Sequence, residues 1–204
     1  MARSDFFRGL PAGCGARIEP LSLRQYQLRE AGKTLQQGSG YPDADALLAA
    51  IVAGDCPPDP GYEYYLAQAI VARELAHTRQ ALQRAIAGQD DIEDSPQQAL
   101  QVAITTRHGA AYPTQLLHHD ALVLTGLDGA QLLLRLLSPC QWRLVWQMTD
   151  GIWALDTLPG ATAPRLSRPD GSQLRLATPA PAQLPALLDW LLTDSAPVRL
   201  AAGV

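Results

Sequence analysis

The chain has 204 residues, 47% of them hydrophobic and 18% charged, which is the composition of an ordinary globular protein with one substantial core or two small ones. Its net charge of −4 disfavours nucleic-acid binding, because that binding depends on Lys and Arg that neutralise phosphates. No apolar run reaches the ~18 residues of a membrane span, and the N-terminus lacks the apolar stretch of a secretory signal. We therefore expect a cytoplasmic protein without membrane insertion, and the predominance of Arg over Lys suggests a bacterial chain.

Two helices are predicted in the first part of the chain. After an irregular N-terminal segment, Ser22 followed by Gln25 matches the capping-box pattern, which predicts a first helix over residues 23–37. Asp43 can cap a second, short helix, and Gly54 suits its C-terminal end. Both helices carry apolar residues on one face, so we expect them to pack against their neighbours.

The longest helical periodicity follows a Pro-rich turn and predicts a third helix over residues 62–87, ended by Gly88. The acidic stretch 89–96 is typical of a solvated linker. It divides the chain into an N-terminal helical unit, residues 1–88, and a second unit, residues 97–204.

Residues 97–107 fit two different structures. The alternation of Leu100, Val102 and Ile104 with polar or small residues favours a strand. Ser95-Pro96 is, however, also a good helix start. The pattern alone leaves both possibilities open.

Three Asp-Gly pairs, Asp128-Gly129, Asp150-Gly151 and Asp170-Gly171, lie between apolar runs in the second unit. Such pairs favour tight hairpin turns, because both residues accept positive φ at low cost. They predict an antiparallel β-meander of six strands. The expected strands are 121–125, 131–137, 142–148, 152–157, 164–167 and 173–178.

The fourth strand segment alternates most clearly, so Trp142 and Trp146 should face a core while Arg143 and Gln147 face the other, exposed side. An amphipathic helix over residues 181–194 closes the chain and should cover one face of the sheet. Its apolar stripe consists of Leu184, Leu187, Leu188, Leu191 and Leu192. The predicted fold class is therefore α+β, a helical unit followed by an antiparallel β-meander closed by a C-terminal helix.

Few residues suggest chemistry. His118 and Asp120, with His108 nearby in sequence, could hold a metal or act as an acid–base pair. Adjacent strand residues point to opposite faces, however, so His119 cannot join His118 at one ion without a bulge. The isolated cysteines and the lack of glycine-rich phosphate loops or a nucleophile elbow lead us to expect no cofactor.

The sequence suggests a partner-binding surface at the start of the third helix. Tyr62, Glu63 and Tyr64 follow a stiff turn that contains Pro57 and Pro58. Tyrosines on a rigid support are typical binding hot spots, and Tyr64 lies off the apolar stripe of its helix.

We therefore expect a non-catalytic protein–protein interaction module, such as an adaptor, an effector chaperone or a secretion-system accessory component. One alternative is a metal-dependent hydrolase or isomerase that uses His108, His118 and Asp120. Another is an immunity protein that neutralises a toxin.

Overall fold

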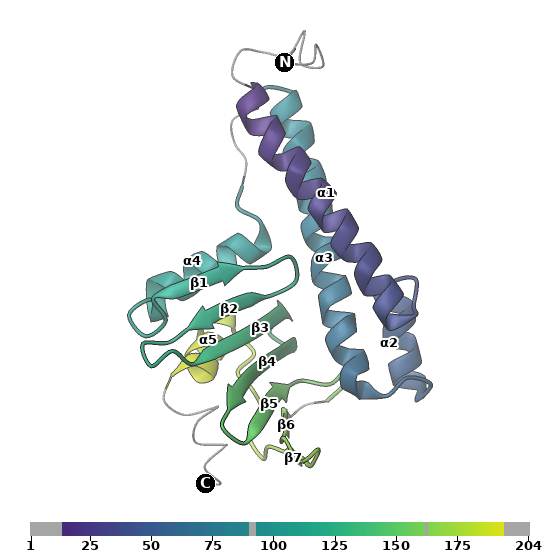
Figure 1. The fold of residues 1–204 in the computed structure, drawn as a ribbon, viewed down its shortest axis with the longest axis vertical. Helices are drawn as coiled ribbons and strands as arrows, with labels where there is room; N and C mark the ends of the chain where they lie inside the picture. The colour runs from purple at the N-terminus through teal and green to yellow at the C-terminus, as the bar shows by residue number, and fades with distance from the viewer. Residues whose placement is uncertain (1–13, 90–92, 162, 194–204) are drawn as a thin grey trace.

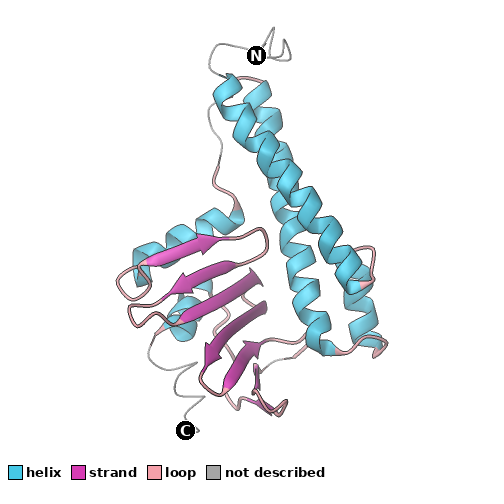
Figure 2. Ribbon diagram, viewed as in Figure 1, coloured by secondary structure: helices cyan, strands magenta, loops and turns pink. Residues whose placement is uncertain are grey.

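The computed structural model describes residues 14–89, 93–161 and 163–193, in which a long helical hairpin stands beside an antiparallel sheet (Figure 1). The predicted α+β class with a β-meander is confirmed (Figure 2). In these residues no helix is both long and apolar enough to cross a bilayer. The helices are α1 (Cys14–Ser39), α2 (Ala44–Ala53), α3 (Pro58–Ile86), α4 (Pro96–His108) and α5 (Leu184–Leu192). The strands are β1 (Thr114–Leu117), β2 (Leu122–Thr125), β3 (Gln131–Ser138), β4 (Gln141–Met148), β5 (Gly151–Asp156), β6 (Arg165–Ser167) and β7 (Gln173–Arg175).

Helix α1 is longer than the sequence predicted. It begins at Cys14, and Ser22 lies inside the helix and does not cap it, so the expected irregular N-terminal segment is wrong from Cys14 onward. The rest of that segment, residues 1–13, lies outside the described residues. The physical reason is tertiary: Ile18, 6% exposed, packs against Ala85 near the end of α3 and holds the extra turns in place.

The expected caps of α2 and the expected C-terminal end of α3 are confirmed, but α3 begins at Pro58, four residues before the predicted start. The Asp43 carboxylate accepts a hydrogen bond from the Ala46 amide, and Gly54 closes α2 at φ 84°. Helix α3 is interrupted near its start, where Asp59 has extended dihedral angles as expected before a proline. Gly88, at φ 73°, follows the end of α3.

The segment after the linker is a helix, so the strand alternative for residues 97–107 is wrong. Ser95 and Gln98 form a complete capping box that starts α4. Leu100 and Ile104, one helical turn apart, are buried, whereas Val102 between them is 56% exposed. Leu100 and Ile104 therefore belong to the buried face of a helix, and the apparent alternation arose only because Val102, which is exposed, lies between them.

The sheet has seven strands in sequence order, and each is antiparallel to the next. Strand β1 is the one that the sequence did not predict. The Asp-Gly pairs lie in the turns β2–β3, β4–β5 and β6–β7, with φ 82° at Gly129, 134° at Gly151 and 82° at Gly171. The positive φ predicted for these turns is confirmed at all three glycines, and glycine is the only residue type with positive φ in the described ranges, so these are not two-residue turns with both central residues at positive φ. The Gly129 amide donates instead to the carbonyl of Gly126, the pattern of a longer hairpin loop with a bulge.

Helices α4 and α5 cover one face of the sheet and enclose the largest apolar core of the described residues (Figure 1). Trp146 stacks on Trp153 at a centroid distance of 6.4 Å, and Trp142 meets Trp190 of α5 edge to face at 6.0 Å. The predicted apolar stripe of the C-terminal helix is confirmed, since four of its leucines are buried in this core. They are Leu187, Leu188, Leu191 and Leu192.

Candidate functional site

Helix α3 lies against the opposite face of the sheet, at one end of β3 and β4, and many of the contacts there are polar. The Arg73 guanidinium donates to the carbonyl of Leu137 at 2.7 Å. The side-chain amide of Gln141 donates to the hydroxyl of Tyr65, also at 2.7 Å. Directional contacts of this kind fix how α3 sits on the sheet.

Ion pairs continue this interface. Arg135 on β3 contacts Glu63 of α3 at 2.7 Å and Asp120 of the β1–β2 turn at 2.7 Å. Arg143 on β4 reaches Asp59, at the start of α3, at 3.2 Å. Both arginines on the sheet therefore form ion pairs with acidic residues near the start of α3.

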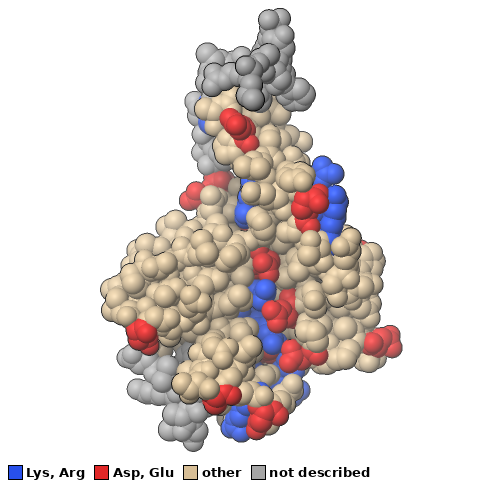
Figure 3. All heavy atoms as spheres, in the orientation of Figure 1, with Lys and Arg blue, Asp and Glu red and all other residues tan. Residues whose placement is uncertain are grey.

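A buried carboxylate on β5 continues the line of charged residues that begins with Arg135 and Arg143; we call this line the charged row. Asp156 on β5 is fully buried and accepts hydrogen bonds from Arg143 at 2.8 Å and from Arg165 of β6 at 3.0 and 3.1 Å. The register places Arg135, Arg143, Asp156 and Arg165 side by side across four strands. Charged atoms accordingly gather in the furrow between the sheet and the helical hairpin (Figure 3).

A hollow of about 360 Å³ opens where the hairpin meets this row. Tyr64 lies beside it, and its ring rests on α1 at Gly38: a Cβ atom there would be 3.0 Å from the ring. Gly38 thus leaves room for the ring. Tyr64 is only partly buried, and its hydroxyl makes no hydrogen bond within the described residues. The hollow is lined by Leu35, Pro60, Glu63, Tyr64, Ala67 and Arg135.

The structure separates the predicted partner-binding residues into two groups. Pro57 and Pro58 are exposed, and Tyr64 is partly exposed at the hollow, next to the paired Glu63. Tyr62 is fully buried; its ring stacks on Tyr65 at 5.7 Å, and burial raises the pKa of its hydroxyl. Tyr62 therefore belongs to the hairpin core, while the other four residues lie on or near the surface.

The residues of the alternative enzymatic site lie apart. His108 is buried on α4 with its Nε2 3.2 Å from Asp189 of α5, whereas Asp120 pairs with Arg135 across the sheet. His118 is exposed just beyond β1. Within the described residues no group of three metal-binding side chains lies close enough to hold an ion. The structure thus does not bring His108, His118 and Asp120 together.

His119, which the sequence pattern excluded from sharing an ion with His118, joins α1 to the sheet unit. The Arg24 guanidinium lies 2.9 Å from Nδ1 of His119, in the β1–β2 turn. Burial and the nearby Arg24 lower the pKa of His119, and Asp120 opposes this effect. A neutral imidazole can accept a hydrogen bond from Arg24, and a protonated one cannot.

The sequence also missed the charged row itself. Arg143 was expected on the exposed side of its strand, but it is 5% exposed and lies under α3, so that prediction is wrong. Alternation gave the correct face, and what it could not show is that α3 covers that face. A charged residue at matching register on successive strands, Arg135, Arg143, Asp156 and Arg165, is the signal that could have found it.

The remainder of the same face, the open sheet face, consists of Leu116, Val123, Leu133, Val145 and Ile152. Leu116 is 56% and Ile152 60% exposed, and the other three are partly buried. In Figure 3 few charged atoms appear over this part of the sheet. It is a second surface, beside the furrow, on which a partner could lie.

No protein-family model matches the chain, and neither a curated protein nor a solved structure is significantly similar to it. An α+β fold by itself hosts many unrelated functions. Function is therefore inferred from the surfaces described above.

Proposed function

We propose that the protein is a non-catalytic protein–protein interaction module of the bacterial cytoplasm, an adaptor, effector chaperone or secretion-system accessory component. Its partner contacts Pro57, Pro58, Glu63 and Tyr64 at the start of α3. The observation that carries this proposal is the hollow of about 360 Å³ beside the partly exposed Tyr64 ring.

Tyr64 has the properties of a binding hot spot. Tyrosine combines a large apolar ring with a hydroxyl that can hydrogen bond, and it is enriched among the residues that dominate binding energy. The close approach of its ring to Gly38 restricts the ring before any partner binds. The entropy that the side chain loses on binding is then small.

The hollow is electrically balanced, which suits the side chains of another protein. Glu63 is 37% exposed at its side chain and is paired with Arg135, so neither charge stands alone. The partly buried Leu35 supplies apolar surface in the same hollow. An apolar centre with a polar rim is the usual anatomy of a protein interface.

Capture of a partner by the tagged protein tests the proposal. We expect Tyr64→Ala to reduce the captured partner by at least about tenfold, which corresponds to roughly 1.4 kcal/mol. Tyr26→Ala is the matched control, because Tyr26 is 63% exposed on α1 and does not line the hollow. Circular dichroism verifies that both variants are folded.

Two other results are informative. If folded Tyr64→Ala keeps the partner and Ile152→Asp loses it, the interface lies on the open sheet face and the proposed site is wrong. The identity of the captured protein separates the remaining classes, because a small toxic enzyme would indicate an immunity protein and a secretion component an adaptor.

A further inference from the structure

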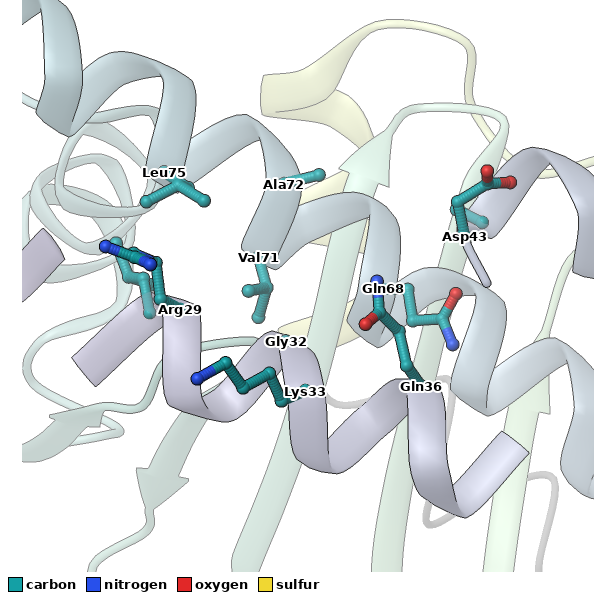
Figure 4. Close-up of a pocket in the computed structure, with 11 residues that line it drawn as sticks. Arg29, Gly32, Lys33, Gln36, Asp43, Gln68, Val71, Ala72 and Leu75 are labelled. Atoms are coloured by element: carbon teal, nitrogen blue, oxygen red, sulfur yellow. The ribbon is translucent and has the colours of Figure 1, made fainter. Parts of the chain in front are cut away.

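A second hollow, of about 270 Å³, lies between α1 and α3 and is separate from the one beside Tyr64 (Figure 4). Arg29 and Lys33 of α1 line one side of it. Gln68, Val71 and Leu75 of α3 line the other side. At 100° per residue these three α3 residues lie roughly opposite the side of α3 that contacts the sheet.

The spacing of the lining residues makes this hollow a groove between two helices. On α1 they recur at Arg29, Lys33 and Gln36, and on α3 at Gln68 and Leu75, so each wall is about two turns, or 10 Å, long. Two helices that expose such a groove offer the position that a third helix occupies in a bundle. A helix is therefore the shape that fits.

The size and floor of the groove favour a protein side chain. Its volume lies below the ~300–1,000 Å³ typical of small-molecule sites. Gly32 has no side chain to fill it, and a Cβ atom there would be 3.7 Å from Val71. Val71 itself is 3% exposed, so the apolar surface open to a side chain on the α3 wall is that of Ala72 and Leu75.

Gln68 provides a polar group in the wall. It is 6% exposed, and its amide nitrogen donates to Ser39 at 2.7 Å and to the Leu35 carbonyl at 3.3 Å. Its Oε1 has no hydrogen-bond partner among the described residues. This oxygen is itself buried, so Gln68 shapes the wall through the two hydrogen bonds that its amide nitrogen donates to α1.

The charged side chains at the rim of the groove indicate which charge a bound segment should carry. Arg29 makes no ion pair or hydrogen bond in the described part of the chain. Lys33 pairs with Glu30 at 2.8 Å, but both side chains are about half exposed and such pairs are weak. The third charged lining residue, Asp43, is engaged in capping α2. Asp43 keeps its negative charge when it caps α2, so the positive charge that the hollow offers to a ligand is on the α1 wall, at Arg29 and Lys33.

We propose that this groove binds an acidic amphipathic helix of a partner protein. An apolar residue of that helix enters the hollow against Ala72 and Leu75, and Asp or Glu residues one turn away pair with Arg29 and Lys33. This goes beyond the proposed function, because it gives the protein two separate binding surfaces, as an adaptor that joins two partners needs.

Fluorescence anisotropy with labelled helical peptides of about five turns tests the proposal on the full chain. One peptide carries a Leu stripe flanked by Glu, and a matched peptide carries Lys at the same positions. We expect the acidic peptide to bind at least about tenfold more tightly, with an affinity that falls as salt is added. Equal binding of both peptides, or no binding of the acidic one at about 1 mM protein, overturns the proposal.

Variants locate the binding. The double substitution Arg29→Glu with Lys33→Glu, and separately Gly32→Leu, should each weaken the acidic peptide by at least about tenfold. Arg79→Glu, at an exposed α3 position outside the groove, is the control and should have no effect. Unchanged binding in folded groove variants contradicts the proposal, as does a change of oligomeric state in them, which would assign the groove to a second copy.

The two proposals fail independently. Tyr64→Ala should leave peptide binding unchanged, because Tyr64 does not line the groove. The groove variants should in turn keep the partner that Tyr64 captures.

Discussion

The core of the sheet half and the junction between the sheet and the helical hairpin depend on different interactions. The sheet, α4 and α5 share one apolar cluster of leucines and tryptophans, whereas the hairpin joins the sheet through charged and polar contacts as well as a small apolar cluster around Tyr62. Apolar burial is strong but non-directional, and hydrogen bonds and ion pairs are weaker but fix orientation. The sheet half should therefore dominate stability, while the junction decides where the hairpin lies.

The same contrast applies to the surfaces that are free to bind. The sheet half buries most of its Leu and Trp residues under α4 and α5, and the part of its opposite face that α3 does not cover is open. The hairpin consists mainly of two paired helices, so Tyr64 stays partly exposed and the groove between α1 and α3 stays open. A helical hairpin that projects from a well-packed sheet is well suited to present binding surfaces.

The largest effect is expected where the junction is most deeply buried. Asp156→Ala should lower the free energy of unfolding by about 3–5 kcal/mol, because it leaves Arg143 and Arg165 buried without their carboxylate. Urea denaturation measures this loss. Asp94→Ala, at an exposed linker position, should change stability by less than about 0.5 kcal/mol. A loss for Asp156→Ala that matched this control would show that the row contributes little.

A core substitution tests the apolar half. Leu188→Ala should cost about 2–5 kcal/mol, since Leu188 is 1% exposed under the sheet and the shortened side chain leaves a cavity. Leu174→Ala, at a position 46% exposed on β7, is the matched control with a much smaller expected effect. An unchanged denaturation midpoint for Leu188→Ala would mean that α5 is not held by the core.

A milder effect is expected at the exposed end of the junction. Arg135→Gln removes the pairs with Glu63 and Asp120, and we expect a loss of about 1 kcal/mol or less, because these carboxylates are partly exposed. The difference from wild type should shrink as salt is added to the urea titration. A loss as large as that of Asp156→Ala, unaffected by salt, would show that the row behaves as one buried unit.

The smallest effect concerns pH. The pKa of His119 is lowered in the folded chain by burial and by Arg24, so the unfolded chain takes up a proton more readily. The contribution of His119 to stability is therefore fully present above its unfolded pKa of about 6.5 and is lost as pH falls below it. Wild type should lose more stability than His119→Gln between about pH 7.5 and pH 5, a range that spans this pKa. His118→Gln, at the exposed neighbouring position, should behave as wild type does; equal losses in wild type and His119→Gln would contradict the assignment.

Much of the fold could be predicted from local pattern. The Asp-Gly turns, the caps at Asp43 and Gly54, and the leucine stripe of the last helix each depend on a few neighbouring residues. The start of α1 could not be predicted, because its first turns depend on Ile18 meeting Ala85, far away in sequence. Strand β1 joins β2 through a turn that has no Asp-Gly pair, so no local turn signal marked it as a strand.

The candidate site was only partly predictable. Tyr64 was identified because it lies off the apolar stripe of its helix, and this local argument agrees with its partial exposure. The burial of Tyr62 and Arg143 could not be read in the same way, since both depend on how α3 lies against the sheet. The groove between α1 and α3 likewise requires two helices in contact.

The sequence by itself determined four of the five described helices, the Asp-Gly turns and the alternation of faces along the strands, because these follow from backbone preferences and from the periods of 3.6 and 2. Only the tertiary structure decided which faces are covered and which are open. The charged row under α3, the hollow beside Tyr64 and the groove at Arg29 and Lys33 all arise where segments distant in sequence meet. Contacts between distant segments depend on the packing of the whole chain, and no local pattern specifies them.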